Sequence, residues 1–156
     1  MQLTRFTDYA LRVLLFVGRQ DGRICTMGEI AAYYRISLDH LRKVVHKMAT
    51  LGYLNSSRGR GGGLLLGRDP AAIRIGDLVF ALENNMSIID CQALDCRLQP
   101  GCSLKTELDR AGRAFIAVLN EVTLHDLLSD AGMQRQFRGI DIAAGVERGD
   151  ARQRRH

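Results

Sequence analysis

The chain of 156 residues lacks the long apolar runs and leader-like features of membrane and secreted proteins. No apolar stretch approaches the roughly 18 residues that a membrane-spanning helix needs. The first residues, MQLTRFTDYALRVLLF, alternate polar and apolar positions and contain no small-residue cleavage site, so they do not resemble a signal peptide. We therefore expect a cytoplasmic protein with no membrane partner.

The chain also lacks the residue patterns of common enzyme classes. Its histidines, His40, His46, His125 and His156, lie apart in the sequence, and no serine or cysteine occupies a nucleophile motif. The glycine-rich stretch GRGGGLLLG does not match the phosphate-binding pattern GxxxxGK[ST], and a predicted strand rather than a helix follows it. We expect a protein that is not an enzyme.

Charge is distributed unevenly along the chain, whose net charge is +5. Residues 1–70 hold eleven Lys and Arg against five Asp and Glu, residues 71–130 hold five against nine, and residues 131–156 hold six against three. A basic N-terminal half suggests a polyanionic partner, with DNA as the first candidate. The alternative is a solvated surface that happens to be basic, and charge alone does not separate the two.

Residues 1–83 have the pattern of a winged helix-turn-helix DNA-binding domain. Thr4 and Thr26 can each cap a helix, and Ser37 can cap a third helix, which is basic. Two short helices joined as tightly as the second and third form a helix-turn-helix pattern. The expected buried stripe of the third helix comprises Leu41, Val44, Val45, Met48 and Leu51.

The third helix carries the candidate DNA contacts. In a helix-turn-helix unit the second helix enters the major groove with its N-terminal residues leading. Serine and lysine can bond base edges or phosphates, and aspartate can accept a hydrogen bond from a cytosine amino group. The alternative for each single residue is a solvated helix face. The candidates are Ser37, Asp39, His40, Arg42, Lys43 and Lys47.

A glycine-rich hairpin follows the third helix. The stretch YLNSSRGRGGGLLLG predicts a short strand, a glycine-rich tip and a second strand, with Arg58 and Arg60 at the tip. A hairpin with arginines at its tip, directly after a recognition helix, is typical of the wing of a winged helix. Such an arginine can enter the minor groove or clamp a phosphate. Beyond it, Pro70 opens a stretch that predicts a core helix closing the domain.

Three of the four cysteines lie within the twelve residues CQALDCRLQPGC, in a segment of loop composition that we call the cysteine loop (residues 84–103). In a reducing cytosol such a cluster more often holds a metal or a redox group than a disulfide. A zinc site needs a fourth ligand that is not nearby, whereas iron–sulfur clusters accept varied spacings. Three thiols without a cofactor are the remaining alternative. The three are Cys91, Cys96 and Cys102, while Cys25 stands alone and is expected to be a small buried residue.

Several stretches, in this order, resemble one protein family. MQLTRFTDYALR, GYLNSSRGRGGGLLLG, AIRIGDLV and the cysteine loop are similar to those of the bacterial winged-helix regulators that carry an iron–sulfur cluster, and among them to the nitric-oxide-sensing repressors. The resemblance covers about residues 1–130. It implies a DNA-binding transcriptional repressor whose operator affinity falls when nitric oxide attacks the cluster, so that nitric oxide detoxification genes are derepressed.

The resemblance also implies the ligands of the cluster. Cys91, Cys96 and Cys102 would hold a cluster of the 4Fe–4S type, with 2Fe–2S as the alternative, and the fourth ligand would be Asp8 from the partner subunit. By itself, Asp8 is also a first-turn carboxylate that the helix dipole favours. The related regulators of cluster assembly have a histidine three residues beyond the last cysteine, where this chain has Lys105. That departure favours a nitric oxide sensor over a sensor of cluster status or redox state.

The longest helical pattern follows the cysteines, and we expect a dimerisation helix and a following short helix over residues 104–130. Its apolar residues are separated alternately by four and three positions, which is a heptad seam. A homodimer suits a helix-turn-helix protein because its two-fold symmetry matches a palindromic operator in double-stranded DNA. The alternative is packing on the chain's own core. The seam comprises Leu104, Leu108, Ala111, Phe115, Val118 and Val122.

The expected fold is therefore mainly α with a small β wing: a winged helix-turn-helix domain followed by a long dimerisation helix. Residues 131–156 are glycine-rich and end in arginines, so we expect a mostly disordered tail that adds at most non-specific DNA affinity. An iron–sulfur electron carrier is a competing function of another class. It explains the cysteines but neither the wing nor the recognition helix.

Overall fold

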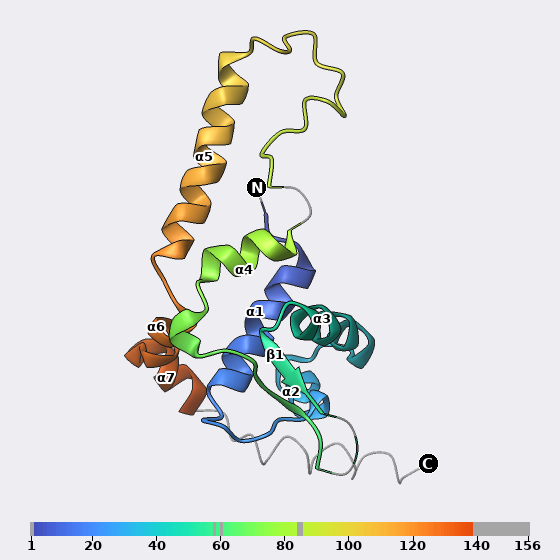
Figure 1. The fold of residues 1–156 in the computed structure, drawn as a ribbon, viewed down its shortest axis with the longest axis vertical. Coiled ribbons are helices and arrows are strands. Elements are labelled where there is room, and N and C mark those ends of the chain that lie inside the picture. Colours follow the sequence, from blue (N-terminus) through green and yellow to red (C-terminus); the bar gives the residue numbers. More distant parts are fainter. Residues whose placement is uncertain (1, 58, 60, 84–85, 139–156) are drawn as a thin grey trace.

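The computed structural model describes residues 2–57, 59, 61–83 and 86–138 (Figure 1). It is mainly α-helical with one two-stranded antiparallel sheet, as predicted. Most elements form a globular part, and the long helix α5 (Ser103–Asn120) stands out from it with the cysteine loop at its far end. None of the helices in the described residues is long and apolar enough to span a bilayer.

The first three helices begin at the predicted caps. Helix α1 (Arg5–Gly18), helix α2 (Met27–Tyr34) and helix α3 (Leu38–Thr50) follow Thr4, Thr26 and Ser37, and each of these hydroxyls accepts a hydrogen bond from a backbone N–H of the first turn. Such a bond satisfies a donor that the helix leaves unpaired. Between α2 and α3 the chain turns at Arg35, whose backbone is in the left-handed region. This turn produces the predicted helix-turn-helix.

The wing is built against the start of α2. Strand β1 (Leu54–Ser56) pairs antiparallel with strand β2 (Leu64–Leu66), and Cys25 exchanges backbone hydrogen bonds with Leu64. Gly63 makes this approach possible, because a Cβ there would lie 2.4 Å from the Cys25 carbonyl oxygen. Cys25 is buried, as predicted, and burial raises the pKa of its thiol to about 11, so it stays neutral.

The predicted wing-tip cations Arg58 and Arg60 lie outside the described residues. Beyond the wing, a short 3-10 helix, η1 (Pro70–Ala72), leads into helix α4 (Ile75–Leu82), whose apolar face is buried as expected of a core helix.

The chain returns to the globular part after α5. Helix α6 (Leu124–Ser129) packs on α1, and helix α7 (Ala131–Arg138) packs on α6. At the start of the tail that was expected to be mostly disordered, residues 131–138 form α7, and Phe137 is buried with its ring stacked on that of Tyr33. The rest of that tail lies outside the described residues.

Polar groups join the base of α5 to the start of α4. The Asn120 side-chain oxygen accepts from the Asp77 backbone N–H at 2.7 Å, and its amide nitrogen donates to the Asp77 carboxylate at 2.9 Å. The Arg74 guanidinium donates to the Asn120 carbonyl oxygen at 2.6 Å. These bonds tie together residues that lie more than forty positions apart in the sequence.

Gly76 allows the two helices to approach so closely. A Cβ at this position would lie 2.4 Å from the Asn120 side-chain oxygen and 2.5 Å from the Ile116 carbonyl oxygen. Because the second contact is with helix backbone, no side-chain rotation can relieve it. We call this contact region, around Gly76 and Asn120, the α4–α5 joint.

Replacing Gly76 with alanine should therefore destabilise the fold. We expect Gly76→Ala to lower the free energy of unfolding by about 1–3 kcal/mol, which corresponds to a melting temperature lower by about 2–4 °C per kcal/mol. Gly28→Ala is the matched control, because the nearest atom to a Cβ there is 3.7 Å away. Thermal unfolding followed by circular dichroism measures both, and equal melting temperatures for the two variants would contradict the close approach at the joint.

Candidate nucleic-acid interface and cysteine loop

One face of α3 is buried and the opposite face is exposed. Leu41, Val44, Val45 and Met48 pack in the core, whereas Leu51 is only partly buried against it. The six candidate DNA contacts, Ser37, Asp39, His40, Arg42, Lys43 and Lys47, are all exposed.

The first turn of α3 positions the ring of His40. The Ser37 hydroxyl oxygen accepts from the His40 backbone N–H at 3.4 Å and lies 3.0 Å from His40 Nδ1. Ser37 thus engages both the backbone and Nδ1 of His40, which leaves Nε2 as the ring nitrogen directed to a ligand, as a donor or an acceptor according to the tautomer.

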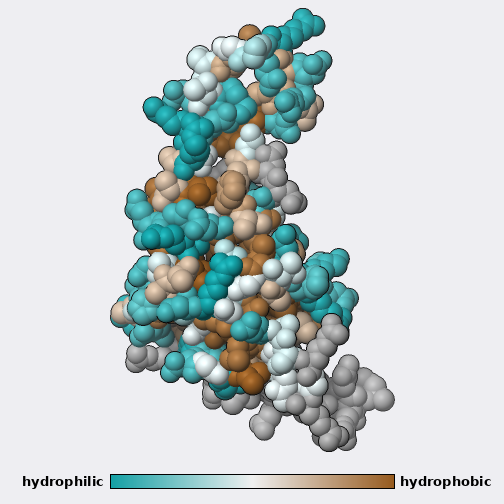
Figure 2. Space-filling view, viewed as in Figure 1, coloured by the Kyte–Doolittle hydropathy of each residue, from teal (hydrophilic) through white to brown (hydrophobic). Residues whose placement is uncertain are grey.

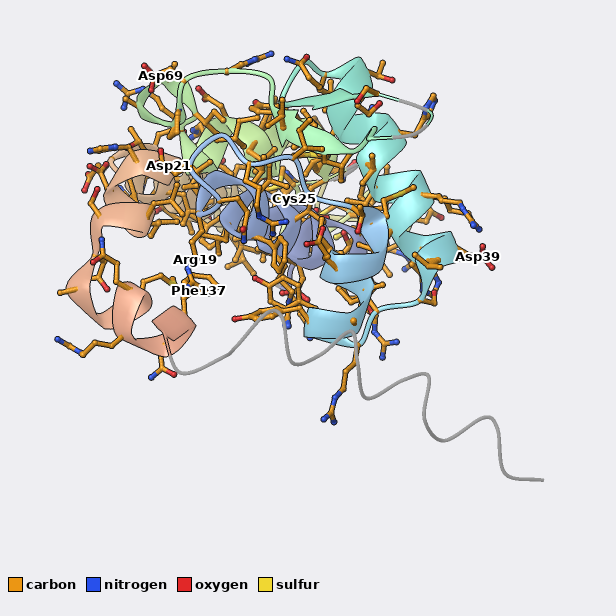
Figure 3. The ribbon with its side chains drawn as sticks, turned by 90° about the horizontal axis from the view of Figure 1, so that it is seen from below. Arg19, Asp21, Cys25, Asp39, Asp69 and Phe137 are labelled. Carbon is orange, nitrogen blue, oxygen red and sulfur yellow. The ribbon has the colours of Figure 1, made fainter. Side chains whose placement is uncertain are left out.

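An ion pair holds Arg42 on the same helix. Arg42 Nη1 donates to the Asp39 carboxylate at 2.5 Å, and both side chains remain well exposed. Figure 3 shows Asp39 projecting away from the globular part at the start of α3. In this arrangement the Asp39 carboxylate orients Arg42, a role that the sequence did not indicate.

A groove separates α3 from the wing. It has a volume of about 550 Å³ and is lined by both polar and apolar groups of α3, of the start of α2 and of the wing. Arg42 lines it together with His46, Ser56 and Ser57. The last three were not among the predicted contacts, because only the folded hairpin brings the wing opposite the second turn of α3.

The cysteine loop connects α4 to α5 and lies at the far end of α5. Cys91 is buried, Cys96 and Cys102 are partly exposed, and none of the three is in a disulfide. The Cys96 N–H donates to the Cys91 carbonyl at 3.2 Å, which closes a turn. Cys102 occupies the N-cap of α5.

Each end of the cysteine loop is attached to a helix. At its start, Glu83 accepts hydrogen bonds from the backbone N–H and the hydroxyl of Thr4, at 2.8 and 3.0 Å, next to the first turn of α1. Burial alone would raise the pKa of Glu83, but hydrogen bonds from Thr7 and Thr4 outweigh it and lower the pKa. Glu83 therefore remains ionised, and α1 is tied to the beginning of the cysteine loop.

Asp8 lies on the first turn of α1, close in sequence to this tie. Both of its carboxylate oxygens accept from Arg12 Nε, at 2.9 and 3.0 Å, and about half of each side chain is exposed. Lys105, at the position where cluster-assembly regulators have histidine, forms an ion pair with Asp109. Lys105 is thus engaged by a carboxylate one helical turn away.

The donor set fits an iron–sulfur cluster in its chemistry. Three free thiols in one loop, one of them at a helix N-terminus, are the ligands that such clusters use. In the described part of this single chain, however, no three Cys, His, Asp or Glu side chains converge closely enough to hold a metal ion. The sequence prediction of the ligand set therefore stays a prediction.

The heptad seam is divided between exposed and packed residues. Leu104 and Val118 are 63% and 59% exposed, and Ala111 is exposed between them. Phe115 and Val122 instead pack partly against the chain's own core, and α5 ends before Val122. The seam predicted from the sequence is thus shorter than expected. In Figure 2, apolar surface is also visible below α5, near its crossing with α4.

Comparisons with known proteins identify the family. The family model of Rrf2, described as an iron-dependent transcriptional regulator, matches residues 3–130. The chain belongs to the Rrf2 family. It is 42% identical over 134 residues to the HTH-type transcriptional regulator NsrR of Bacillus subtilis, covering 83% of this chain and 92% of that protein. It is 45% identical over 141 residues to NsrR of Geobacillus kaustophilus, covering 88% and 96%.

A solved Rrf2-type structure has the same fold. CymR (YrzC), the global cysteine regulator of B. subtilis, superposes with a TM-score of 0.69 at 28% identity, over 83% of this chain and 97% of that one. The predicted family and the winged-helix fold class are thereby confirmed. The relatives of this Rrf2 protein are named as transcriptional regulators, which also confirms the expectation that it is not an enzyme.

If α3 lies on DNA as predicted, its outer lysines should neutralise phosphates. We expect Lys43→Ala and Lys47→Ala each to weaken binding to duplex DNA of arbitrary sequence and to reduce the slope of log K against log salt by about 1. Arg110→Ala is the control, since Arg110 lies on α5 and pairs with Glu107. Fluorescence anisotropy over a salt series tests this, and an equal loss in the control would count against α3 as the interface.

Proposed function

We propose that this Rrf2 protein is a transcriptional repressor that senses nitric oxide through an iron–sulfur cluster of the 4Fe–4S type held by Cys91, Cys96 and Cys102. The observation that carries the proposal is a loop with three free thiols that begins just after Glu83, which is bonded to Thr4 at the start of α1, and ends at Cys102, the N-cap of α5. The identity of more than 40% to NsrR proteins supports it. When bound, the cluster supplies iron that can react with nitric oxide.

The protein would bind a palindromic operator in double-stranded DNA as a homodimer. The exposed part of the α5 seam, Leu104, Ala111 and Val118, is the surface that we assign to pairing with a second copy. Two copies related by two-fold symmetry would present two α3 helices to two half-sites. Arg42, Lys43 and the wing would then contact each half-site.

The chain's own residues would transmit the signal. Glu83 ties the start of the cysteine loop to Thr4 and so to α1, and α1 packs on the recognition helix α3. Asp8, on the same turn of α1, would be the fourth ligand to the partner's cluster. Loss of that ligand would release α1 and change the spacing of the two α3 helices, with a coupling of about 1–3 kcal/mol.

The cysteine assignment predicts a sharp difference among the four thiols. Cys91→Ala, Cys96→Ala and Cys102→Ala should each abolish bound iron and sulfide in anaerobically purified protein, whereas Cys25→Ala, which removes a buried neutral thiol, should retain both. Metal and sulfide analysis with visible absorption measures this. Zinc in place of iron, or iron retained by all of the loop variants, would contradict the assignment.

Operator binding tests the function itself. The cluster-loaded protein first selects its preferred duplexes from a random pool. The complex of the protein with such a duplex is then titrated with nitric oxide, and an anaerobic gel shift measures binding. We expect the shifted band to disappear at a few nitric oxide per cluster. A band indifferent to nitric oxide would refute the proposed signal and favour a sensor of cluster status or redox state, and a redox-active cluster without operator binding would favour an electron carrier.

Asp8 can be separated from its ion pair with Arg12. Asp8→Ala removes the carboxylate, and we expect operator affinity of the loaded protein to fall about fivefold or more, because the link between cluster and α1 is lost. Arg12→Ala breaks the same ion pair but keeps the carboxylate, so it should resemble the unmodified protein. Normal operator binding and a normal nitric oxide response in Asp8→Ala would show that Asp8 is not the fourth ligand.

A further inference from the structure

A second cavity lies on the globular part, away from the cysteine loop. It has a volume of about 400 Å³ and is enclosed by the end of α1, the turn after it, α6 and α7. Part of its wall comes from α7, which lies beyond the residues matched by the family model. The lining residues are Gly18, Arg19, Asp21, Leu128, Gln134 and Phe137.

Arg19 lines this cavity and has one donor nitrogen that is buried and unpaired. Among the described residues, its Nη1 is the one buried side-chain nitrogen or oxygen without a hydrogen-bond partner. The guanidinium lies over the Phe137 ring, 4.6 Å from the ring centroid, which orients it but leaves that N–H unsatisfied. Buried donors in proteins are nearly always paired, with an anion or water where no side chain serves. A carboxylate is the planar acceptor that an arginine fork matches.

Asp21 brings the opposite charge to the same cavity. Its side chain is exposed, and neither Asp21 nor Arg19 forms an ion pair with any described residue. The two charges are therefore both available to a ligand. A simple anion would be opposed by Asp21 and a simple cation by Arg19, whereas a molecule that carries both charges suits the pair.

Apolar groups complete the wall of the cavity. Phe137 and Leu128 line the cavity. The absence of a side chain at Gly18 makes room for Leu128, because a Cβ at Gly18 would lie 2.7 Å from a Leu128 methyl carbon. A cavity of this volume, with a few polar groups on an apolar wall, has the form of a small-molecule site. Figure 3 shows Arg19 beside Phe137, on the side of the molecule opposite Asp39 and the start of α3.

We propose that this cavity binds a free α-amino acid with an apolar side chain. Arg19 would bind the carboxylate, Asp21 the ammonium group, and Phe137 and Leu128 the side chain. Occupancy would hold α7 against α1 and leave the exposed face of α3 free. Because the site shares no residue with the cysteine loop or the DNA contacts, the proposal stands or falls independently of nitric oxide sensing.

Isothermal titration calorimetry with the full chain tests this, using L-leucine, L-methionine and L-phenylalanine at millimolar concentration. We expect at least one of them to bind and to raise the melting temperature. The amide of that amino acid, which lacks the carboxylate, and its N-acetyl derivative, which lacks the ammonium group, should each bind about tenfold more weakly or worse. If none of the three amino acids binds, the proposal is overturned. It is also overturned if the amide and the N-acetyl derivative both bind as tightly as the amino acid itself.

Matched variants assign the two charges. Arg19→Gln and Asp21→Asn should each lose affinity about tenfold or more, while Arg23→Gln should not, since Arg23 pairs with Glu29 and does not line the cavity. Because the Asp21 side chain is exposed, Asp21→Asn should leave the packing of α7 unchanged. This variant therefore tests the proposal even if Arg19→Gln loosens α7. Affinity unchanged in Asp21→Asn would exclude the proposed ammonium contact.

Discussion

The close approach of α4 and α5 at Gly76 is the constraint on which the position of the long helix depends. Only a residue without a Cβ lets the Asn120 side chain reach the first turn of α4, where it bonds both the backbone and the carboxylate of Asp77. Because α5 stands away from the globular part over the rest of its length, a small change of angle at this joint is amplified at the far end. The joint therefore positions both the cysteine loop and the exposed seam relative to the recognition helix.

The cysteine loop is held at both of its ends. The cysteine loop begins next to Glu83, which holds the N-cap of α1, and it ends at Cys102, which begins α5. In the proposed mechanism, a change inside the loop would act on α1 and α5 at once, and α1 packs on α3. Glu83 supports this coupling because its pKa is lowered, so that its carboxylate stays ionised and the hydrogen bonds to Thr4 persist at neutral pH.

Local signals in the sequence predicted the elements well, and long-range contacts account for what they missed. The caps at Thr4, Thr26 and Ser37 depend only on residues within one turn, so a reader of the sequence can find them. The Asn120–Asp77 bonds and the packing of Phe137 join residues far apart in the chain, and no periodicity reports them. The heptad pattern predicted a pairing seam, and it did not reveal that Phe115 and Val122 pack partly against the chain's own core. The cysteine spacing restricts cluster chemistry without fixing it.

The recognition helix is preorganised by its own first turn. Ser37 both caps the helix and contacts Nδ1 of His40, and Asp39 holds Arg42 beside the groove toward the wing. Side chains held before binding lose less conformational entropy on the DNA than free ones do. Asp39 has a second consequence, because its charge repels phosphates and so favours a docking in which Arg42 leads. In the proposed docking of α3 in the major groove, the same carboxylate that orients the arginine would therefore also restrict how the helix can lie.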